Sequence, residues 1–282
     1  MNKLGERIAF SYYRTKFRIL STVSKKKTAE IALELFHTPQ FRYKRIILPK
    51  IFDEAERLSF NLNGETVQGY RWNKDGYKRV LITHGFNSTI SKYGDYIRQF
   101  IDKGYEVLAF DAPAHGRSTG KQINAVIYKE MILFINEHYG PIQSFMGHSF
   151  GGLALSLALE EIPHNENFRL VLIAPATESK TAIDFFFSFM KLNADVRKEF
   201  DQKIFSITNK QPEWYSVSRA VKNLKTKILW CHDESDRLTP WQDAKKVKEQ
   251  NYPNINFVIT NGLGHRGIYR DETITKRIVD FL

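Results

Sequence analysis

The sequence predicts an α/β protein in which helices cover both faces of a mostly parallel sheet. From residue 80 onward, short apolar segments alternate with amphipathic helical segments, which is the order of repeated strand–helix crossovers. Two segments of alternating polarity, 57–62 and 66–72, precede this series and are separated by Asn63-Gly64, a dipeptide typical of tight hairpin turns. We therefore expect an antiparallel hairpin at one edge of the sheet.

The predicted parallel strands are short apolar runs. They lie at residues 80–82, 107–110, 144–146, 170–173, 228–231 and 256–259. Helical spacing of apolar residues predicts helices at 28–36, 93–102, 126–137 and 153–159. The alternation is interrupted once, at 176–213, where about 38 residues replace a normal crossover. Long insertions of this kind are usually functional, so we expect a short helical lid there.

The composition excludes several classes of protein. Of the 282 residues, 42% are hydrophobic and 26% are charged, which is ordinary for a globular chain and excludes a collagen-like, coiled-coil or disordered protein. The single cysteine, Cys231, excludes an intramolecular disulfide and a multi-cysteine metal site. No apolar run approaches the roughly 18 residues of a transmembrane helix, and basic residues interrupt the first 20 positions. We therefore expect a cytoplasmic protein without a secretory signal.

Positive charge is concentrated at the N-terminus. Residues 1–50 contain 12 Lys and Arg against 3 Glu, a net charge of +9 out of the total of +11. We interpret 1–50 as a basic helical extension and 51–282 as the catalytic domain. Aromatic residues such as Phe10, Tyr13 and Phe17 suggest either that the extension packs on the main domain or that it contacts an anionic membrane surface. No nucleic-acid-binding motif accompanies the charge, so we expect no nucleic-acid partner.

The segment Gly147-His148-Ser149-Phe150-Gly151 lies between a predicted strand and a predicted helix. A G-x-S-x-G sequence in that context forms a sharp turn that lifts the serine hydroxyl above the carboxyl edge of the sheet. The helix that begins at Phe150 points its free N–H groups toward that hydroxyl. The pattern predicts Ser149 as a nucleophile.

A serine nucleophile needs a neighbouring base, and His265 is the best candidate. It follows the last predicted strand, so its loop opens on the same edge of the sheet as Ser149. His115 is a weaker alternative. The acid that orients the base is expected in the loop after the preceding strand, where Asp236 is favoured and Asp233 competes.

An oxyanion hole requires two backbone N–H groups directed at the tetrahedral oxygen. One is expected from Phe150, at the start of the helix. The other is expected from Phe86, in the loop after the first parallel strand.

Together these residues resemble the α/β-hydrolase superfamily, and most closely its lipase- and serine-aminopeptidase-like branch. The resemblance covers about residues 57–282, and residues 1–50 have no recognised counterpart. The matching features are His84-Gly85, the loop 111–118, the turn 147–151, Asp236 with Pro240, and Gly264-His265.

The resemblance implies an α/β-hydrolase fold with Ser149 as nucleophile, Asp236 as acid and His265 as base. It also admits an acid after the earlier strand, where Glu178 stands. A serine at the nucleophile position, where dehalogenases and epoxide hydrolases have aspartate, argues against those chemistries.

The expected function is hydrolysis of a small uncharged carboxylic ester, as by an esterase or small lipase, without a metal or an organic cofactor. Phe185, Phe186, Phe189 and Met190 in the insertion suggest the lining of an acyl pocket, or alternatively residues that fix the insertion to the core. An amidase or aminopeptidase, and a non-catalytic binding protein with the same fold, are the alternatives. The sequence does not indicate an oligomeric state.

Overall fold

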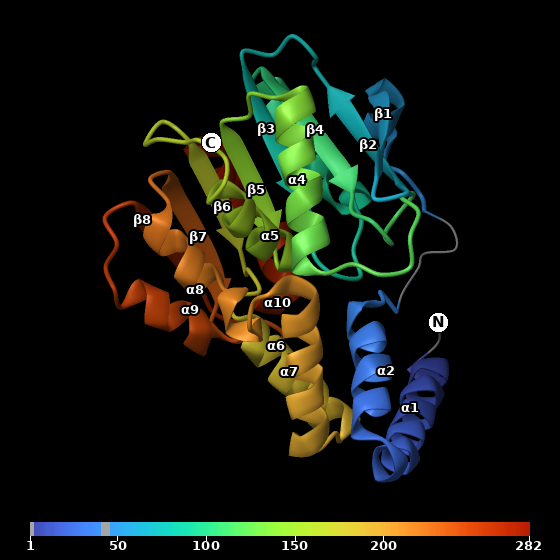
Figure 1. Cartoon of the computed structure of the whole chain (residues 1–282). Helices are drawn as coiled ribbons and strands as arrows, with labels where there is room; N and C mark the ends of the chain where they lie inside the picture. Colours follow the sequence, from blue (N-terminus) through green and yellow to red (C-terminus); the bar gives the residue numbers. More distant parts are fainter. Residues whose placement is uncertain (1–2, 41–45) are drawn as a thin grey trace.

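The computed structural model describes residues 3–40 and 46–282 and contains one eight-stranded sheet (Figure 1). The strand order is β1-β2-β4-β3-β5-β6-β7-β8. β2 pairs antiparallel with β1 and with β4, and all other neighbouring strands are parallel. The predicted mostly parallel sheet with an antiparallel hairpin at one edge is confirmed.

All eight predicted strands form. Their bounds are β1 (Glu56–Leu62), β2 (Glu65–Trp72), β3 (Lys78–Thr83), β4 (Tyr105–Asp111), β5 (Ser144–His148), β6 (Arg169–Ile173), β7 (Lys227–Asp233) and β8 (Ile255–Thr260). In the hairpin turn, Asn63 and Gly64 have φ of 52° and 84°. Positive φ at both turn residues matches the twist of the flanking strands, which explains why this dipeptide is found there.

Consecutive strand residues point to opposite faces of the sheet, and both faces are buried under helices. Val80 and Ile82 belong to one core, and Leu81 between them belongs to the other. The first core is covered by α3 (Gly94–Asp102) and α11 (Glu272–Phe281).

Four further helices cover the second core. They are α4 (Ala125–Tyr139), α5 (Phe150–Leu159), α8 (Val217–Ala220) and α9 (Trp241–Lys248). The remaining short helices are η1 (Lys50–Glu54), η2 (Ile90–Tyr93), η3 (Pro212–Trp214), η4 (Val221–Asn223), α10 (Gly264–Gly267) and η5 (Ile268–Arg270).

The N-terminal segment contains two consecutive helices, α1 (Lys3–Val23) and α2 (Lys25–His37). Ser24 separates them and caps α2, since its side chain accepts a hydrogen bond from the Lys27 N–H. Phe17 is only 1% exposed and Leu33 is buried, so the apolar side of this pair packs on other helices. Ile19 and Val23, in contrast, remain exposed.

The insertion between β6 and β7 contains α6 (Ser179–Met190) and α7 (Ala194–Thr208). α2 packs along α7, and α1 contacts both α2 and α6. These four helices therefore gather at one end of the molecule, below the sheet in Figure 1. Within the described ranges, no helix has the length and apolar character needed to cross a membrane.

Candidate active site

Ser149 occupies a strained turn between β5 and α5. Its backbone has φ 56° and ψ −121°, far from the regions that non-glycine residues usually adopt. Neighbouring glycines allow the close approach that this turn requires. A Cβ added to Gly147 would lie 2.8 Å from the Gly152 Cα, and a Cβ added to Gly151 would lie 2.7 Å from the His84 carbonyl oxygen. The local geometry is that of a nucleophile elbow.

Ser149, His265 and Asp236 form one hydrogen-bonded chain. The His265 Nε2 lies 3.0 Å from the Ser149 Oγ, and the His265 Nδ1 lies 2.7 Å from the Asp236 Oδ2. An ionised carboxylate can only accept a hydrogen bond, so Nδ1 carries the imidazole proton and Nε2 can accept the serine hydroxyl. The structure thus brings the three predicted residues together from the ends of β5, β7 and β8.

Asp236 is held by its own loop as well as by His265. The Leu238 and Thr239 N–H groups donate to its Oδ1, at 2.8 and 3.0 Å, and the Thr239 hydroxyl donates to its Oδ2. Burial alone would raise the pKa of Asp236, but the hydrogen bonds from His265 and Thr239 outweigh it, and the pKa lies below its usual value. Asp236 is therefore ionised at neutral pH and can stabilise a protonated His265.

The two competing acids bond elsewhere. The Asp233 carboxylate accepts hydrogen bonds from Ser235, from Thr260 and from the Leu263 N–H, and so connects the loops that follow β7 and β8. The carboxylate of Glu178 accepts a hydrogen bond from the Ser218 hydroxyl. His265 bonds to Asp236 instead.

The predicted oxyanion residues lie on both sides of the Ser149 turn. Phe150 follows Ser149 directly, and Gly85 places the other loop against it, since a Cβ on Gly85 would lie 2.9 Å from the Ser149 Cβ. Within the described part of the chain, neither the Phe86 nor the Phe150 N–H donates a hydrogen bond to another residue. Phe150 follows Ser149 and Phe86 follows Gly85, so both N–H groups belong to residues next to the contact between the two loops.

His115 and His148 have other partners. The Nε2 of His115 accepts the Asn87 N–H at 3.2 Å, and its Nδ1 lies 3.0 Å from the Pro113 carbonyl oxygen. His148 donates from Nε2 to the His265 carbonyl oxygen at 3.1 Å. Burial lowers the pKa of His148 to about 3, so its ring is neutral and supports the backbone of the loop that carries His265.

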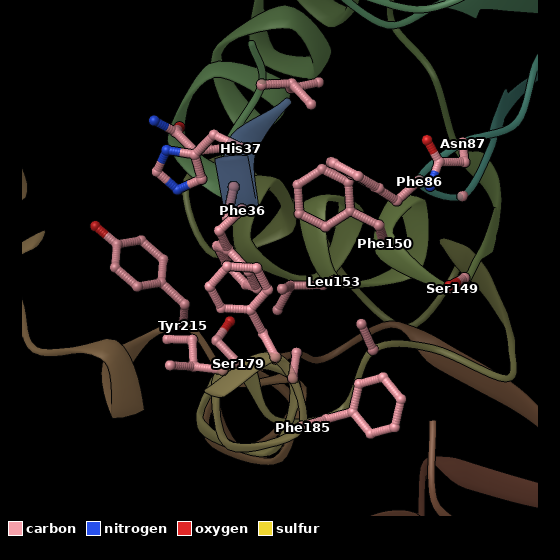
Figure 2. Close-up of a pocket in the computed structure, with 18 of the residues that line it drawn as sticks. Phe36, His37, Phe86, Asn87, Ser149, Phe150, Leu153, Ser179, Phe185 and Tyr215 are labelled. Atoms are coloured by element: carbon pink, nitrogen blue, oxygen red, sulfur yellow. The ribbon is translucent and has the colours of Figure 1, made fainter. Parts of the chain in front are cut away.

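A cavity of about 890 Å³ opens beside Ser149 and His265. Figure 2 shows Ser149 at one end of the view and His37 and Tyr215 at the other. All four residues predicted to form a pocket contribute to the lining, namely Phe185, Phe186, Phe189 and Met190. They differ in exposure, because Phe185 is 58% exposed whereas Met190 is 2% exposed.

Sequence reasoning missed one wall of this cavity. Leu33, Phe36 and His37 of α2 line it, together with residues at the start of α4. The apolar spacing in α2 predicted a packed helix but carried no signal about which surface the helix meets.

Among the side chains that the structure describes, those of residues 10–40 and 46–282, no cluster of three or more His, Cys, Asp or Glu could hold a metal ion.

The chain is similar to known proteins in sequence and in fold. The sequence model of the serine aminopeptidase, S33, family matches residues 75–219, just over half of the chain. Among solved structures, an esterase of Pyrococcus furiosus is 22% identical with a TM-score of 0.65, over 87% of this chain and 97% of that chain. No curated protein sequence matches.

Two further structures show the same fold. Est1E from Butyrivibrio proteoclasticus, solved with ferulic acid bound, is 18% identical with a TM-score of 0.60, over 79% of this chain and 97% of that one. The mouse alpha/beta hydrolase domain-containing protein 10 is 17% identical with a TM-score of 0.59, over 80% and 96% of the two chains. The predicted α/β-hydrolase fold is confirmed, and the chain belongs to the serine aminopeptidase, S33, family of α/β hydrolases.

Proposed function

We propose that the protein is a serine hydrolase that cleaves an uncharged carboxylic ester through an acyl-enzyme on Ser149. The observation that carries this proposal is the hydrogen-bonded chain from Ser149 through His265 to Asp236, at the opening of a largely apolar cavity. A serine hydroxyl is unreactive by itself, and this chain supplies both a base and the group that orients the base.

In the proposed reaction, His265 takes the hydroxyl proton as the Ser149 Oγ attacks the ester carbonyl carbon. The negative charge that develops on the carbonyl oxygen is stabilised by the N–H groups of Phe86 and Phe150. Phe150 is the first residue of α5, where the helix dipole is favourable. Collapse of the intermediate breaks the bond to the alcohol, which receives its proton from His265. A water molecule, deprotonated by His265, then releases the acid and restores Ser149.

The nature of the cavity supports an ester without a formal charge. Phe36, Phe150, Leu153 and Ile183 contribute apolar side chains to its lining. The related Pyrococcus furiosus protein is an esterase, and Est1E binds ferulic acid, an aromatic carboxylic acid. The fold by itself does not distinguish ester from amide hydrolysis, because one scaffold serves both.

The test combines covalent labelling with a substrate panel. Purified protein is treated with a fluorophosphonate probe, and turnover is measured on p-nitrophenyl esters and on aminoacyl p-nitroanilides. We expect labelling at Ser149, as identified by peptide mass spectrometry, and faster turnover of the esters. Faster turnover of the anilides would identify an aminopeptidase or amidase. No labelling and no turnover would identify a non-catalytic binding protein and overturn the proposal.

A further inference from the structure

The cavity beside Ser149 extends well beyond the reacting atoms. Phe86 and Phe150, the two residues with available N–H groups, also place their aromatic rings on its wall, with ring centroids 5.8 Å apart. In Figure 2 these two rings lie between Ser149 and Phe36. The apolar lining thus begins at the oxyanion donors and continues toward α2.

The far wall is built by the N-terminal helices together with the insertion. The ring centroid of Phe36 on α2 lies 5.3 Å from that of Phe186 on α6 and 6.0 Å from that of Phe200 on α7. Phe200 is fully buried, so one side of the Phe36 ring packs on the core. Another part of the Phe36 ring faces the cavity. Contacts among these three aromatic rings stabilise the position of Phe36 against the insertion.

Polar contacts hold α1 and α2 against the insertion. The Arg14 guanidinium donates from Nε to the Phe189 carbonyl oxygen at 2.8 Å and lies 4.7 Å from the centre of the Phe189 ring. At the start of α2, the Lys25 Nζ lies 3.7 Å from the Asp195 carboxylate. These helices precede the segment 75–219 that matches the family, so this chain adds a wall to its own site from outside that segment.

We propose that this site takes esters with a long apolar acyl chain, and that α2, through Phe36, sets the length of chain that fits. The inference rests on the proposed function. The carbonyl oxygen bound by the Phe86 and Phe150 N–H groups fixes the carbonyl carbon, so the acyl chain starts beside those two rings. A cavity of about 890 Å³ is large for a ligand pocket, and a two-carbon acyl group would leave most of it to water.

The far end of the cavity is compatible with such a chain. His37 lies there in Figure 2, and burial lowers its pKa to about 4, so its imidazole is neutral at physiological pH. The lining also contains Glu30, Glu34 and Lys203, but most of its surface is apolar, and a neutral imidazole there imposes a smaller desolvation cost than a charged one would.

The test measures kcat/KM on p-nitrophenyl acetate, butanoate, octanoate and dodecanoate. The readout is the ratio of the dodecanoate value to the butanoate value. Phe36→Trp enlarges a side chain in the wall. Ile31→Phe is the matched control, because it enlarges another half-buried apolar residue of α2 that does not line the cavity. Folding of each variant is checked by its thermal unfolding midpoint.

We expect the wild-type ratio to exceed one and to fall about tenfold or more in Phe36→Trp, the scale on which hydrophobic pockets discriminate chain length. Ile31→Phe should leave the ratio unchanged. If Phe36→Trp does not fold, His37→Trp provides the same test from the next residue.

Two negative results have different meanings. An unchanged ratio in folded Phe36→Trp would overturn the role of α2 while leaving ester hydrolysis intact. Absence of turnover on every ester by the wild-type protein would overturn the proposed function, and the inference with it.

Discussion

His84 and His115 each accept a backbone N–H from the loop that carries the other. The Nε2 of His84 accepts the Ala112 N–H at 3.0 Å, and the Nε2 of His115 accepts the Asn87 N–H at 3.2 Å. The two rings lie 5.1 Å apart. An imidazole that accepts at Nε2 carries its proton at Nδ1. Both rings therefore hold the loop of Gly85 and Phe86 against the loop of Ala112 only while they are neutral.

This arrangement predicts a loss of stability in mild acid. Burial lowers the pKa of His84 to about 4, below its usual value of 6.5. Between these two pH values the unfolded chain binds a proton that the folded chain does not, so unfolding becomes more favourable as pH falls. The contribution of His84 to the free energy of unfolding is complete above pH 6.5. It is lost as the pH falls toward 4, by up to about 1.4 kcal/mol per pH unit.

Urea unfolding at a series of pH values checks this expectation, with His84→Gln as the comparison. The amide can accept the Ala112 N–H but does not titrate. The variant should be less stable than the wild type at neutral pH and should lose less stability between pH 6.5 and 4. Parallel pH profiles for the two proteins would show that His84 does not titrate in this range.

Ser149→Ala should abolish ester turnover and fluorophosphonate labelling without unfolding the protein. Loss of a nucleophile that acts as one unit with its base costs on the order of 10⁶ in kcat in a serine protease. Ser156→Ala is the matched control, because Ser156 lies on α5, which begins directly after Ser149, is fully buried and donates to the Gly152 carbonyl oxygen. Residual turnover of Ser149→Ala at the control level would refute the assignment of the nucleophile.

Asp236→Asn should lower kcat by about 10⁴-fold, the loss known for the same change in a serine protease triad, because an amide favours the wrong imidazole tautomer. Asp233→Asn should mainly lower the thermal unfolding midpoint, since the Asp233 carboxylate connects two loops. Glu178→Gln should have a small effect on kcat. A larger kcat loss in either of these two variants than in Asp236→Asn would move the acid to that residue.

The sequence predicted where the catalytic candidates lie, but it did not predict which helix forms the far wall of the cavity. Ser149, His265 and Asp236 each follow a strand of a parallel sheet, and carboxyl ends of parallel strands meet at one edge, so topology alone predicted that they lie close together. The contact between Phe36 and Phe186 does not follow from the topology of the sheet. An apolar stripe on a helix shows that the helix packs but does not show on what, and only the tertiary contact of α2 with α7 brings Phe36 to the cavity.

The basic extension gives the last prediction, which is binding to anionic membranes. Much of its apolar surface is packed inside, but Ile19 and Val23 are 61% and 80% exposed, and Arg18 and Lys26 are exposed nearby in the sequence. Full-length protein should therefore co-sediment with vesicles that contain phosphatidylserine more than with vesicles of phosphatidylcholine alone.

The double variant Arg18→Glu/Lys26→Glu should weaken this binding, because each basic residue near an anionic surface contributes about 1 kcal/mol. Lys74→Glu, which changes an exposed charge in the loop between β2 and β3, is the control and should retain most of the binding. The reach of the attraction shortens to about 8 Å at physiological ionic strength, so pelleting should decrease as salt is added. Equal pelleting with both kinds of vesicle at low salt would show that these charges simply face water.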